Sequence, residues 1–541
     1  MEKKKKYLIL GIIILLALGG VTVAYLTWSS NKINIGLNSD CFTIDYTKGG
    51  DINNASVKLM NESDLIDSNN KFTIKEGIAL TYANIGIKST CGIEGYGSLY
   101  LNITSLSDAF TTGNSVGALK YAILKNTSTS TVSVANLLNQ SFNIEKKGSI
   151  TSTGTKKILT KQLSNTEVNK YIIVIYIDKS LSGNDVIGAS FSGKISADAN
   201  QGIAPMGAAT EYITNLYTEA SKEEVTNNSI TYNKAPSVNL MNDRLGGTTT
   251  SLDGGNIRYY GASPNNYIYF NCSDYSNQTS STCEVWRIIG VFDGKVKLIR
   301  NTSIGDYSWD NKDKTTGAEN NEGKNDWTTA RLMKLLNPSD YYTVDTNDNG
   351  LGQSLYYNSG SGKCYSGAGN TTVDCDFTST GIKNDTTRNL IAETTWNLGG
   401  WNSGVVYSNQ MYEYERGKTV YHGRPTTPWK GKIALAYPSD YGYAAEFGTN
   451  YCNKQLSSYN DATCKSNNWM NAILGTSSYG FLLTPGLSFS GYAWLVYSDG
   501  HVYSNYYASN ASGVSPVLYL NSDVEFKDGD GSSASPYQLN A

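Results

Sequence analysis

Apolar residues in the first part of the chain follow the patterns that β-strands produce. Residues 98–104 (SLYLNIT) and 118–125 (ALKYAILK) have the alternation or β-branched content of half-buried strands. Residues 170–178 (KYIIVIYID) are a continuous apolar run, which is typical of a strand at the centre of a sandwich. A Ser-Gly-Asn-Asp turn separates this run from residues 186–196, and we expect the two segments to pair. The pattern therefore predicts an all-β sandwich over residues 31–200.

Residues 201–250 have the pattern of a linker that contains one short amphipathic helix. A polar run follows the helical repeat, and the repeat lasts only about three turns, which is too short for a coiled coil. Glu211 and Glu219 fall on the polar side of the predicted helix. The apolar positions that recur at helical spacing are Ala209, Tyr212, Ile213, Leu216, Tyr217 and Ala220.

Residues 251–541 combine strand and helix patterns with long polar loops. The dipeptides Asp293-Gly294 and Asp499-Gly500 each separate two apolar segments, which predicts two β-hairpins with tight turns. Asp326 precedes a helical pattern that Pro338 ends. A small sheet, few helices and long loops predict an irregular α+β domain.

The N-terminus predicts export. Lys3 to Lys6 precede a 22-residue uncharged stretch, residues 7–28, which is long enough to span a bilayer with the lysines on the cytoplasmic side. A cleaved signal peptide within residues 1–30, ending at Ala24, is the alternative. We therefore expect either a single-pass membrane protein with its C-terminal part outside, contacting the membrane through residues 7–28, or a secreted protein.

The charge balance argues against a nucleic-acid partner. The chain has 44 basic and 47 acidic residues, of which residues 1–30 hold four lysines and one glutamate. The remainder is therefore acidic, with 40 basic and 46 acidic side chains, and lacks the excess of cations that phosphate backbones require. All Arg lie at or after Arg244 and all Pro at or after Pro205, which favours two separate modules.

The cysteine spacing indicates disulfide bonds, which fits an oxidising compartment. No C-x-x-C motif is present and no His lies near a cysteine pair, so a zinc site is disfavoured. Eight cysteines allow 105 connectivities, and proximity favours one of them. The expected pairs are Cys41–Cys91, Cys272–Cys283, Cys364–Cys375 and Cys452–Cys464.

Both ends of the first module resemble a known family. The segments GGVTVAYLTWSS and YIIVIYIDKSLSGNDVIGASFSGKISADANQ resemble the export signal and closing strands of the camelysin and TasA family of Gram-positive surface and biofilm-fibre proteins. The resemblance implies an exported sandwich domain, and for TasA-like proteins a fibre-forming one. Camelysin-like proteins are described as metalloproteases, but this chain has no H-E-x-x-H motif and only two His.

The second module resembles an uncharacterised domain of Gram-positive surface proteins. The segments that carry the resemblance are IRYYGASPNNYIYFN, VWRIIGVFDGKVKLIR, GKIALAYPSDYGYA, FLLTPG, YAWLVYSDGHV and GVSPVLYLNSDVEFKDGDGSSASPY. The last of these is also similar to the C-type-lectin-like fold of formylglycine-generating enzymes and of retroelement-diversified proteins. The resemblance implies a C-type-lectin-like fold. The activity of the formylglycine enzymes is not implied, because each C-terminal cysteine here has a nearby disulfide partner.

Candidate catalytic groups lack supporting motifs. His422 and His501 have no G-x-S-x-G elbow or comparable context. Residues 528–532 alternate oxygen donors but lack the downstream Glu of a calcium loop, so a glycine-rich turn is favoured. We expect no enzyme activity, catalytic residue, metal or cofactor. Carboxylates such as Glu413, Glu415, Asp440 and Glu446 could flank a glycosidic bond, but we expect them to form a solvated face.

A binding surface is predicted between residues 488 and 510. Tyrosine, tryptophan, serine and asparagine are concentrated there, and these residues supply rigid amphipathic area beside hydrogen-bonding groups. The alternative is that Trp494 and Val496 face the core and that the tyrosines only line a sheet. The predicted ligand-binding residues are Tyr492, Trp494, Tyr497, Asp499, Tyr503, Asn505, Tyr506, Tyr507 and Asn510.

These patterns favour an exported, non-catalytic surface protein whose C-type-lectin-like head recognises a protein or a glycan at the cell surface. Two alternatives stay open. The sandwich could form a structural subunit of an extracellular matrix fibre, or the chain could be a secreted hydrolase with an unrecognised carboxylate site.

Overall fold

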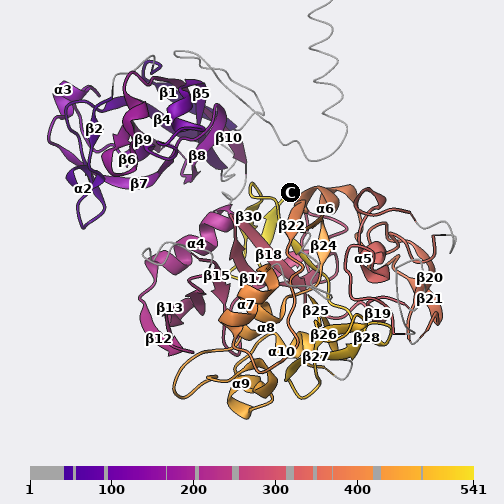
Figure 1. Cartoon of the computed structure of the whole chain (residues 1–541). Helices are drawn as coiled ribbons and strands as arrows, with labels where there is room; N and C mark the ends of the chain where they lie inside the picture. The colour runs from indigo at the N-terminus through magenta and orange to yellow at the C-terminus, as the bar shows by residue number, and fades with distance from the viewer. Residues whose placement is uncertain are drawn as a thin grey trace, which may run out of the picture. The chain divides into compact units, whose positions relative to one another are not determined.

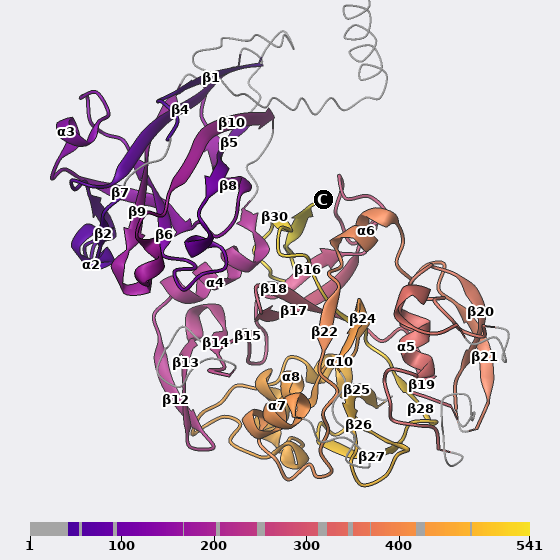
Figure 2. The same cartoon turned by 45° about the horizontal axis from the view of Figure 1, so that its top comes forward.

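The protein is β-rich and consists of two compact units, residues 1–204 and 205–541, each with its own hydrophobic core (Figures 1 and 2). This confirms the β-rich, multidomain organisation expected from the sequence. The computed structural model describes residues 42–541 apart from residues 53–56, 90–94, 166, 202–205, 246–254, 312–321, 345–349, 368, 418–427 and 477–478.

The predicted transmembrane or signal segment, residues 7–28, lies outside the described residues. In the part of the chain that the structure describes, no helix combines the length and the apolar character that a membrane crossing requires. The two interpretations of this segment therefore stay predictions.

Two sheets make up the first unit. One sheet has the strand order β1-β4-β9-β6-β7-β3, and the other has the order β10-β5-β8. The strands are β1 Phe42–Lys48, β2 Leu59–Met60, β3 Lys71–Thr73, β4 Ala79–Ser89, β5 Gly95–Leu106, β6 Leu119–Lys125, β7 Ser141–Ser149, β8 Gly154–Leu163, β9 Val168–Asp178 and β10 Phe191–Gln201, and the short helices are α2 Glu62–Leu65 and α3 Val134–Leu137.

Strand β9 is apolar along most of its length because both of its faces are buried. Successive side chains of a strand point to opposite faces of the sheet. Ile173 and Ile175 face the core shared by the two sheets, where they meet Leu101 of β5. Ile172 and Val174 face a second, smaller core on the other side of the sheet. The continuous run at 170–178 therefore marks a central strand, as predicted.

The expected pairing of residues 170–178 with residues 186–196 is wrong. Strand β9 pairs with β4 and β6, whereas β10 pairs with β5 in the opposite sheet. The connection after Asp178 crosses between the sheets and is anchored by Asp185, whose carboxylate accepts hydrogen bonds from the Asn114 backbone and the Ser115 hydroxyl. Sequence proximity suggested a hairpin, but packing Phe191 into the shared core requires the crossover.

The second unit is built on a sheet with the order β12-β13-β14-β15-β17-β18-β29-β24, in which β16 also pairs with β17. A second sheet has the order β19-β28-β25-β26-β27. The strands are β11 Gly207–Ala208, β12 Glu223–Asn227, β13 Ile230–Ala235, β14 Leu240–Asn242, β15 Ile257–Tyr259, β16 Tyr267–Phe270, β17 Glu284–Phe292, β18 Lys295–Arg300, β19 Asp306–Ser308, β20 Ser361–Tyr365, β21 Thr372–Asp376, β22 Thr394–Trp396, β23 Trp429–Gly431, β24 Ile433–Ala434, β25 Gly480–Pro485, β26 Tyr492–Val496, β27 Val502–Tyr507, β28 Ala511–Gly513, β29 Val517–Tyr519, β30 Glu525–Asp528 and β31 Gln538–Asn540.

Short helices accompany these sheets: α4 Ala209–Glu219, α5 Arg331–Leu336, α6 Asp385–Leu390, α7 Ser408–Arg416, α8 Pro438–Tyr443, α9 Ala462–Ser466 and α10 Asn471–Leu474. The helix expected directly after Asp326 begins later, at Arg331. The Asp326 carboxylate caps a preceding turn instead, where it accepts hydrogen bonds from the backbone N–H and the hydroxyl of Thr328.

The hairpin predicted at Asp293-Gly294 is present as β17 and β18, whereas the linker predicted over residues 201–250 is not. Helix α4 forms, with Ala209 and Ile213 buried as expected. The polar run after it forms β12 and β13, which extend the main sheet of the second unit. Asn228 and Ser229 turn the chain between them with φ of 47° and 61°. The left-handed Asn-Ser turn is a weaker hairpin signal than Asn-Gly, which explains the error.

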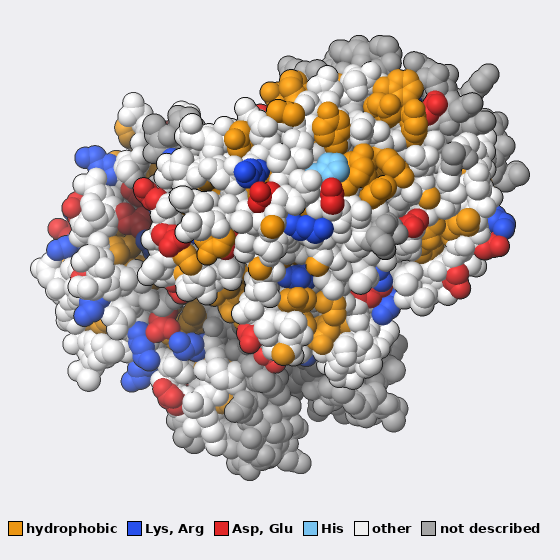
Figure 3. Space-filling model, turned by 90° about the horizontal axis from the view of Figure 1, so that it is seen from below, with side chains coloured by type: hydrophobic (Ala, Val, Ile, Leu, Met, Phe, Trp, Pro, Cys, Tyr) orange, Lys and Arg blue, Asp and Glu red, His pale blue; other side chains and the backbone are white. Residues whose placement is uncertain are grey.

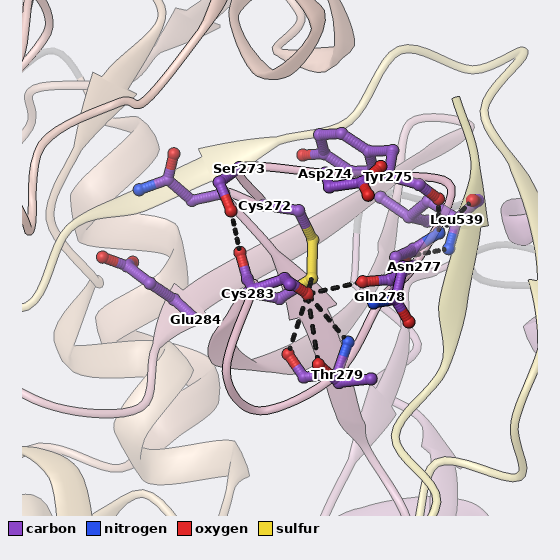
Figure 4. Close-up of a disulfide and its surroundings, with 12 residues drawn as sticks. Cys272, Ser273, Asp274, Tyr275, Asn277, Gln278, Thr279, Cys283, Glu284 and Leu539 are labelled. Atoms are coloured by element: carbon purple, nitrogen blue, oxygen red, sulfur yellow. Dashed lines mark hydrogen bonds between the residues drawn. A yellow bond between two sulfur atoms is a disulfide. The ribbon is translucent and has the colours of Figure 1, made fainter.

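Disulfides close three loops of the second unit. The pairs are the expected Cys272–Cys283, Cys364–Cys375 and Cys452–Cys464, and Cys41 and Cys91 lie outside the described residues. Figure 4 shows the first of these loops beside the C-terminal strand. Gln278 donates a hydrogen bond to the Leu539 carbonyl (2.6 Å) and accepts one from the Leu539 backbone N–H (2.8 Å). The loop therefore holds the end of the chain in place.

A buried ion network joins the main sheet to helix α8. The carboxylate of Asp440 accepts hydrogen bonds from Lys297 of β18 and from Arg258 of β15, the latter at 2.9 Å. Arg258 also pairs with Asp243 at 2.5 Å, so two cations balance two anions. Burial alone would raise the pKa of the Asp440 carboxyl, but the two cations outweigh burial and lower the pKa below its ordinary value. Asp440 is therefore charged in the core.

Glu415 of α7 is fully buried next to this network, and its cationic partner, Arg416, is partly exposed. Its carboxylate accepts hydrogen bonds from the Ser439 backbone N–H (2.8 Å) and hydroxyl (2.5 Å), and Arg416 approaches at 3.3 Å. Burial raises the pKa of the Glu415 carboxyl to about 7, and repulsion by Asp440 adds to the increase, whereas Arg416 and Ser439 oppose it. Glu415 therefore keeps its proton at a pH where an exposed glutamate has lost it.

We expect Asp440→Asn to lower the free energy of unfolding of the second unit by about 3–5 kcal/mol, because it leaves Lys297 and Arg258 buried without their shared anion. Urea unfolding followed by tryptophan fluorescence measures the loss. The matched control is Asp385→Asn, which removes the carboxylate from an exposed pair with Arg388 and should cost less than about 1 kcal/mol. Equal effects of the two variants would contradict a structural role for the network.

Glu415 should make stability depend on pH. Its pKa rises from 4.5 in the unfolded chain to about 7 in the folded one, so the folded state holds the extra proton between these values. Stability therefore falls as the pH rises through this window, by roughly 3 kcal/mol in total. The difference in unfolding free energy between Glu415→Gln and the wild type should grow by that amount between pH 4.5 and pH 7. A difference that stays constant would show that Glu415 titrates normally.

Candidate functional site

The predicted binding segment forms the hairpin of β26 and β27. Asp499 and Gly500 make its turn, in which the Gly500 N–H donates to the Tyr497 carbonyl at 2.9 Å and the Tyr497 N–H donates to the His501 carbonyl at 2.9 Å. Gly500 has a φ of 100°, which residues with a side chain rarely adopt. The hairpin predicted from the Asp-Gly dipeptide is therefore confirmed.

A first aromatic cluster consists of Tyr479, Tyr497 and Tyr506. Tyr479 lies just before β25, and its ring centroid is 5.0 Å from that of Tyr497 and 5.6 Å from that of Tyr506. The three rings are half-buried, so each keeps part of its surface open to solvent. Tyr497 also stacks on the His501 ring, with centroids 4.0 Å apart and an angle of 12° between the planes.

A second aromatic cluster consists of Phe489, Tyr492 and Tyr507. The ring of Tyr492 lies 5.0 Å from Phe489 and 5.3 Å from Tyr507, which faces it across the hairpin. The side chain of Tyr507 is 39% exposed, which is high for an aromatic residue in a strand. The edge-to-face and tilted contacts hold the rings in place, and they leave the outer side of the Tyr507 ring open to solvent.

Polar groups fix the turn end of the hairpin. The Asp499 carboxylate accepts hydrogen bonds from the His501 backbone N–H at 3.2 Å and from its ring Nδ1 at 2.5 Å. Partial burial works to raise the pKa of the Asp499 carboxyl, but the bonds from His501 outweigh burial and lower the pKa. The Tyr497 hydroxyl donates to the Asn505 side-chain oxygen at 2.6 Å. A carboxylate and an amide therefore lie at the edge of the aromatic surface.

The predicted binding residues fall into three classes of exposure. Trp494 is buried with 0% of its surface exposed, and its indole N–H donates to the Trp401 carbonyl at 3.0 Å. Its inclusion in the site is therefore wrong, because it faces the core beside a bulge that follows Ala493. Asp499, Asn505 and Tyr507 are exposed, and the half-buried members are Tyr492, Tyr497, Tyr503, Tyr506 and Asn510.

Tyr479 belongs to this surface and was not predicted. It lies outside the tyrosine-rich segment and reaches the hairpin only because β25 pairs with β26. The apolar run FLLTPG, which follows Tyr479 directly, was the available signal of a strand at this position. The partner strand of such a run is not evident from one sequence.

The expectation that the candidate carboxylates form a solvated face is wrong for two of them. Asp440 and Glu415 are buried side by side in the core, and Glu446 accepts a hydrogen bond from Lys234 at 3.0 Å. Glu413 is exposed, and His422 lies outside the described residues. Among the described residues, no group of three or more His, Cys, Asp or Glu could hold a metal ion.

The two aromatic clusters lie on the same hairpin, and each offers phenol rings; hydroxyl and amide groups accompany them at the turn end. Figure 3 shows a face of the molecule on which hydrophobic side chains gather around a histidine. Such rings offer flat apolar faces, and their hydroxyl groups donate and accept hydrogen bonds. The arrangement can therefore bind a partner that has both apolar faces and many hydroxyl groups.

Searches against known protein families and against curated proteins found no match to this chain.

We expect Trp494→Ala to lower the free energy of unfolding by about 3–5 kcal/mol, because it leaves a cavity and an unpaired Trp401 carbonyl. Tyr507→Ala should cost only about 1 kcal/mol, since much of its ring is already in solvent. Chemical unfolding of both variants measures the difference. Similar costs would indicate that Trp494 is not a core residue.

Proposed function

We propose that this chain is an exported cell-surface protein whose second unit recognises a carbohydrate through the β26–β27 hairpin. The observation that carries the proposal is that one hairpin holds two aromatic clusters, and that one of them includes Tyr507, which is 39% exposed. Sugar rings pack their C–H faces on aromatic rings, and their hydroxyl groups pair with amide and carboxylate oxygens such as those of Asn505 and Asp499.

A protein partner is the alternative reading of the same surface. Tyrosine, serine and asparagine are also the residues of antibody-like binding loops. A carbohydrate is favoured because the tyrosines of the hairpin are exposed or half-buried, whereas its large aliphatic side chains, such as Leu495 and Val496, are buried. Protein interfaces usually add such aliphatic anchors at their centre.

The wider proposal retains the family resemblance. We propose a C-type-lectin-like head for residues 251–541 and a camelysin- or TasA-like sandwich for residues 31–200, delivered through residues 1–30. The two facing sheets of the first unit and the irregular sheets and loops of the second are compatible with this assignment. A matrix fibre and a secreted hydrolase remain the alternatives.

Glycan-array binding of the purified full-length chain tests the proposal. Tyr507→Ala should weaken binding to a glycan hit at least about tenfold, which corresponds to about 1.4 kcal/mol. The matched control is Tyr451→Ala, since Tyr451 is 40% exposed, lies outside the hairpin and contacts Lys234.

The possible outcomes distinguish the proposal from its alternatives. Loss of glycan binding by Tyr507→Ala alone supports the proposal. An array without hits, or equal effects of the Tyr507 and Tyr451 variants, would contradict it. Concentration-dependent filaments of the wild type, seen by electron microscopy, would favour the fibre, and hydrolysis of array glycans would favour the hydrolase.

A further inference from the structure

The second unit contains a polar pocket away from the aromatic hairpin. Its volume is about 490 Å³, which is in the range of pockets that hold small ligands. Its lining includes residues of helix α4, of the ends of β14 and β15, of the β17–β18 turn and of α7. Lining side chains from these elements are Thr214, Tyr217, Asn242, Ile257, Asp293 and Tyr412.

A narrower recess adjoins this pocket. It has a volume of about 40 Å³ and shares Asn256, Asp293 and Tyr412 with the pocket. Its other walls include the cationic side chains of Lys295 and Arg416. The pocket therefore changes from a mixed aromatic and polar chamber to a small compartment with two positive charges.

The shared wall is fixed by the buried ion network. The side-chain amide of Asn256 donates to the Asp243 carboxylate at 2.9 Å and to the Tyr412 hydroxyl at 3.4 Å. Asp243 is in turn held by Arg258 at 2.5 Å. Asn256 and Tyr412 thus have set orientations before any ligand arrives, which lowers the entropy lost on binding.

Arg416 is held in a position where it can meet an anion. Its guanidinium lies 3.4 Å from the Tyr412 ring centroid, and its Nη1 donates to Glu415 at 3.3 Å and to the Tyr412 carbonyl at 3.4 Å. Its side chain is 25% exposed, whereas that of Glu415 is fully buried. The planar guanidinium matches a carboxylate, with which it can form two parallel hydrogen bonds.

The charges around the recess favour a monoanion over a phosphate. Arg416 is the last residue of α7, and the C-terminal end of a helix carries a partial negative charge. The Asp293 carboxylate on the shared wall adds further negative charge. A dianion would meet both, whereas a single carboxylate can reach Arg416 and leave Asp293 to accept hydrogen bonds from hydroxyl groups.

We propose that this pocket binds a small acidic sugar, with its carboxylate on Arg416, its hydroxyl groups on Asp293 and Asn256, and its ring beside the side chains of Tyr217 and Tyr412. The site shares no residue with the aromatic hairpin. It is therefore independent of the carbohydrate recognition proposed there, and it can be tested separately.

Titration calorimetry of the full-length chain with glucuronate, galacturonate and N-acetylneuraminate tests the pocket. At least one acid should bind at one site per chain, and glucose and inorganic phosphate should bind at least about tenfold more weakly, since a charge-assisted contact contributes that much. Absence of binding by all three acids, or equal binding of glucose or phosphate, would overturn the proposal.

Single substitutions test whether the acid binds at Arg416. Arg416→Gln should weaken acid binding at least about tenfold, whereas Arg388→Gln, which breaks an exposed pair with Asp385, should leave it unchanged. If Arg416→Gln does not fold, the double variant with Glu415→Gln removes the buried carboxylate left behind. Acid binding that survives in the folded variant would overturn the assignment of Arg416.

Two further variants test whether the acid binds in this pocket or on the aromatic hairpin. Asp293→Asn keeps the turn, because asparagine tolerates the φ of 48° at this position, and should weaken the acid about threefold or more by removing a charged acceptor. Tyr507→Ala should leave acid binding unchanged. A loss of acid binding in Tyr507→Ala would place the acid on the hairpin and overturn the pocket, whereas failure of the hairpin proposal alone would leave these titrations unaffected.

Discussion

The interaction on which the second unit depends is the buried contact of Asp440 with Arg258 and Lys297. It joins β15, β18 and α8, which are far apart in the sequence. Charges removed from water cost several kcal/mol each, and this cost is offset only when every partner is present. The three elements must therefore assemble together. The network in this way joins the main sheet of this unit to helix α8 and, through α8, to α7 and the loops. Arg258 also contacts the rings of Phe292 and Tyr443, so the network is enclosed by aromatic side chains.

Only one of the two proposed sites depends directly on this rigid centre. The acidic-sugar pocket lies directly on the network, because Asn256 and Tyr412 are oriented through Asp243. The aromatic hairpin belongs to the second sheet, where ring contacts and the Asp499–His501 hydrogen bonds fix the side chains. Neither site relies on a long free loop among the described residues. Both would therefore bind their ligands with little reorganisation of the protein.

Local signals in the sequence predicted local structure. The Asp-Gly dipeptides located both hairpins, and the close cysteine pairs gave the disulfides of the second unit, because turns and short covalent loops depend on neighbouring residues. Long-range pairing could not be predicted in this way. The partners Arg258 and Asp440 are 182 positions apart, and nothing in either segment identifies the other. The inclusion of Trp494 in the binding surface is wrong, whereas the alternative drawn from strand alternation, that Trp494 and Val496 face the core, is confirmed. The partner of the Trp494 indole N–H, the carbonyl of the distant Trp401, could not be predicted from the local sequence.

The two sites also differ in the force that would select their ligands. Phenol rings around Tyr507 offer apolar area and neutral hydrogen bonds, and these contacts change little with ionic strength. The recess beside Arg416 selects by charge, and partial burial of that guanidinium reduces screening by salt. A neutral glycan would therefore favour the hairpin, and a free acidic sugar would favour the pocket. If both proposals hold, the hairpin would bind the sugar faces of a polymer and the pocket would bind a single acidic unit.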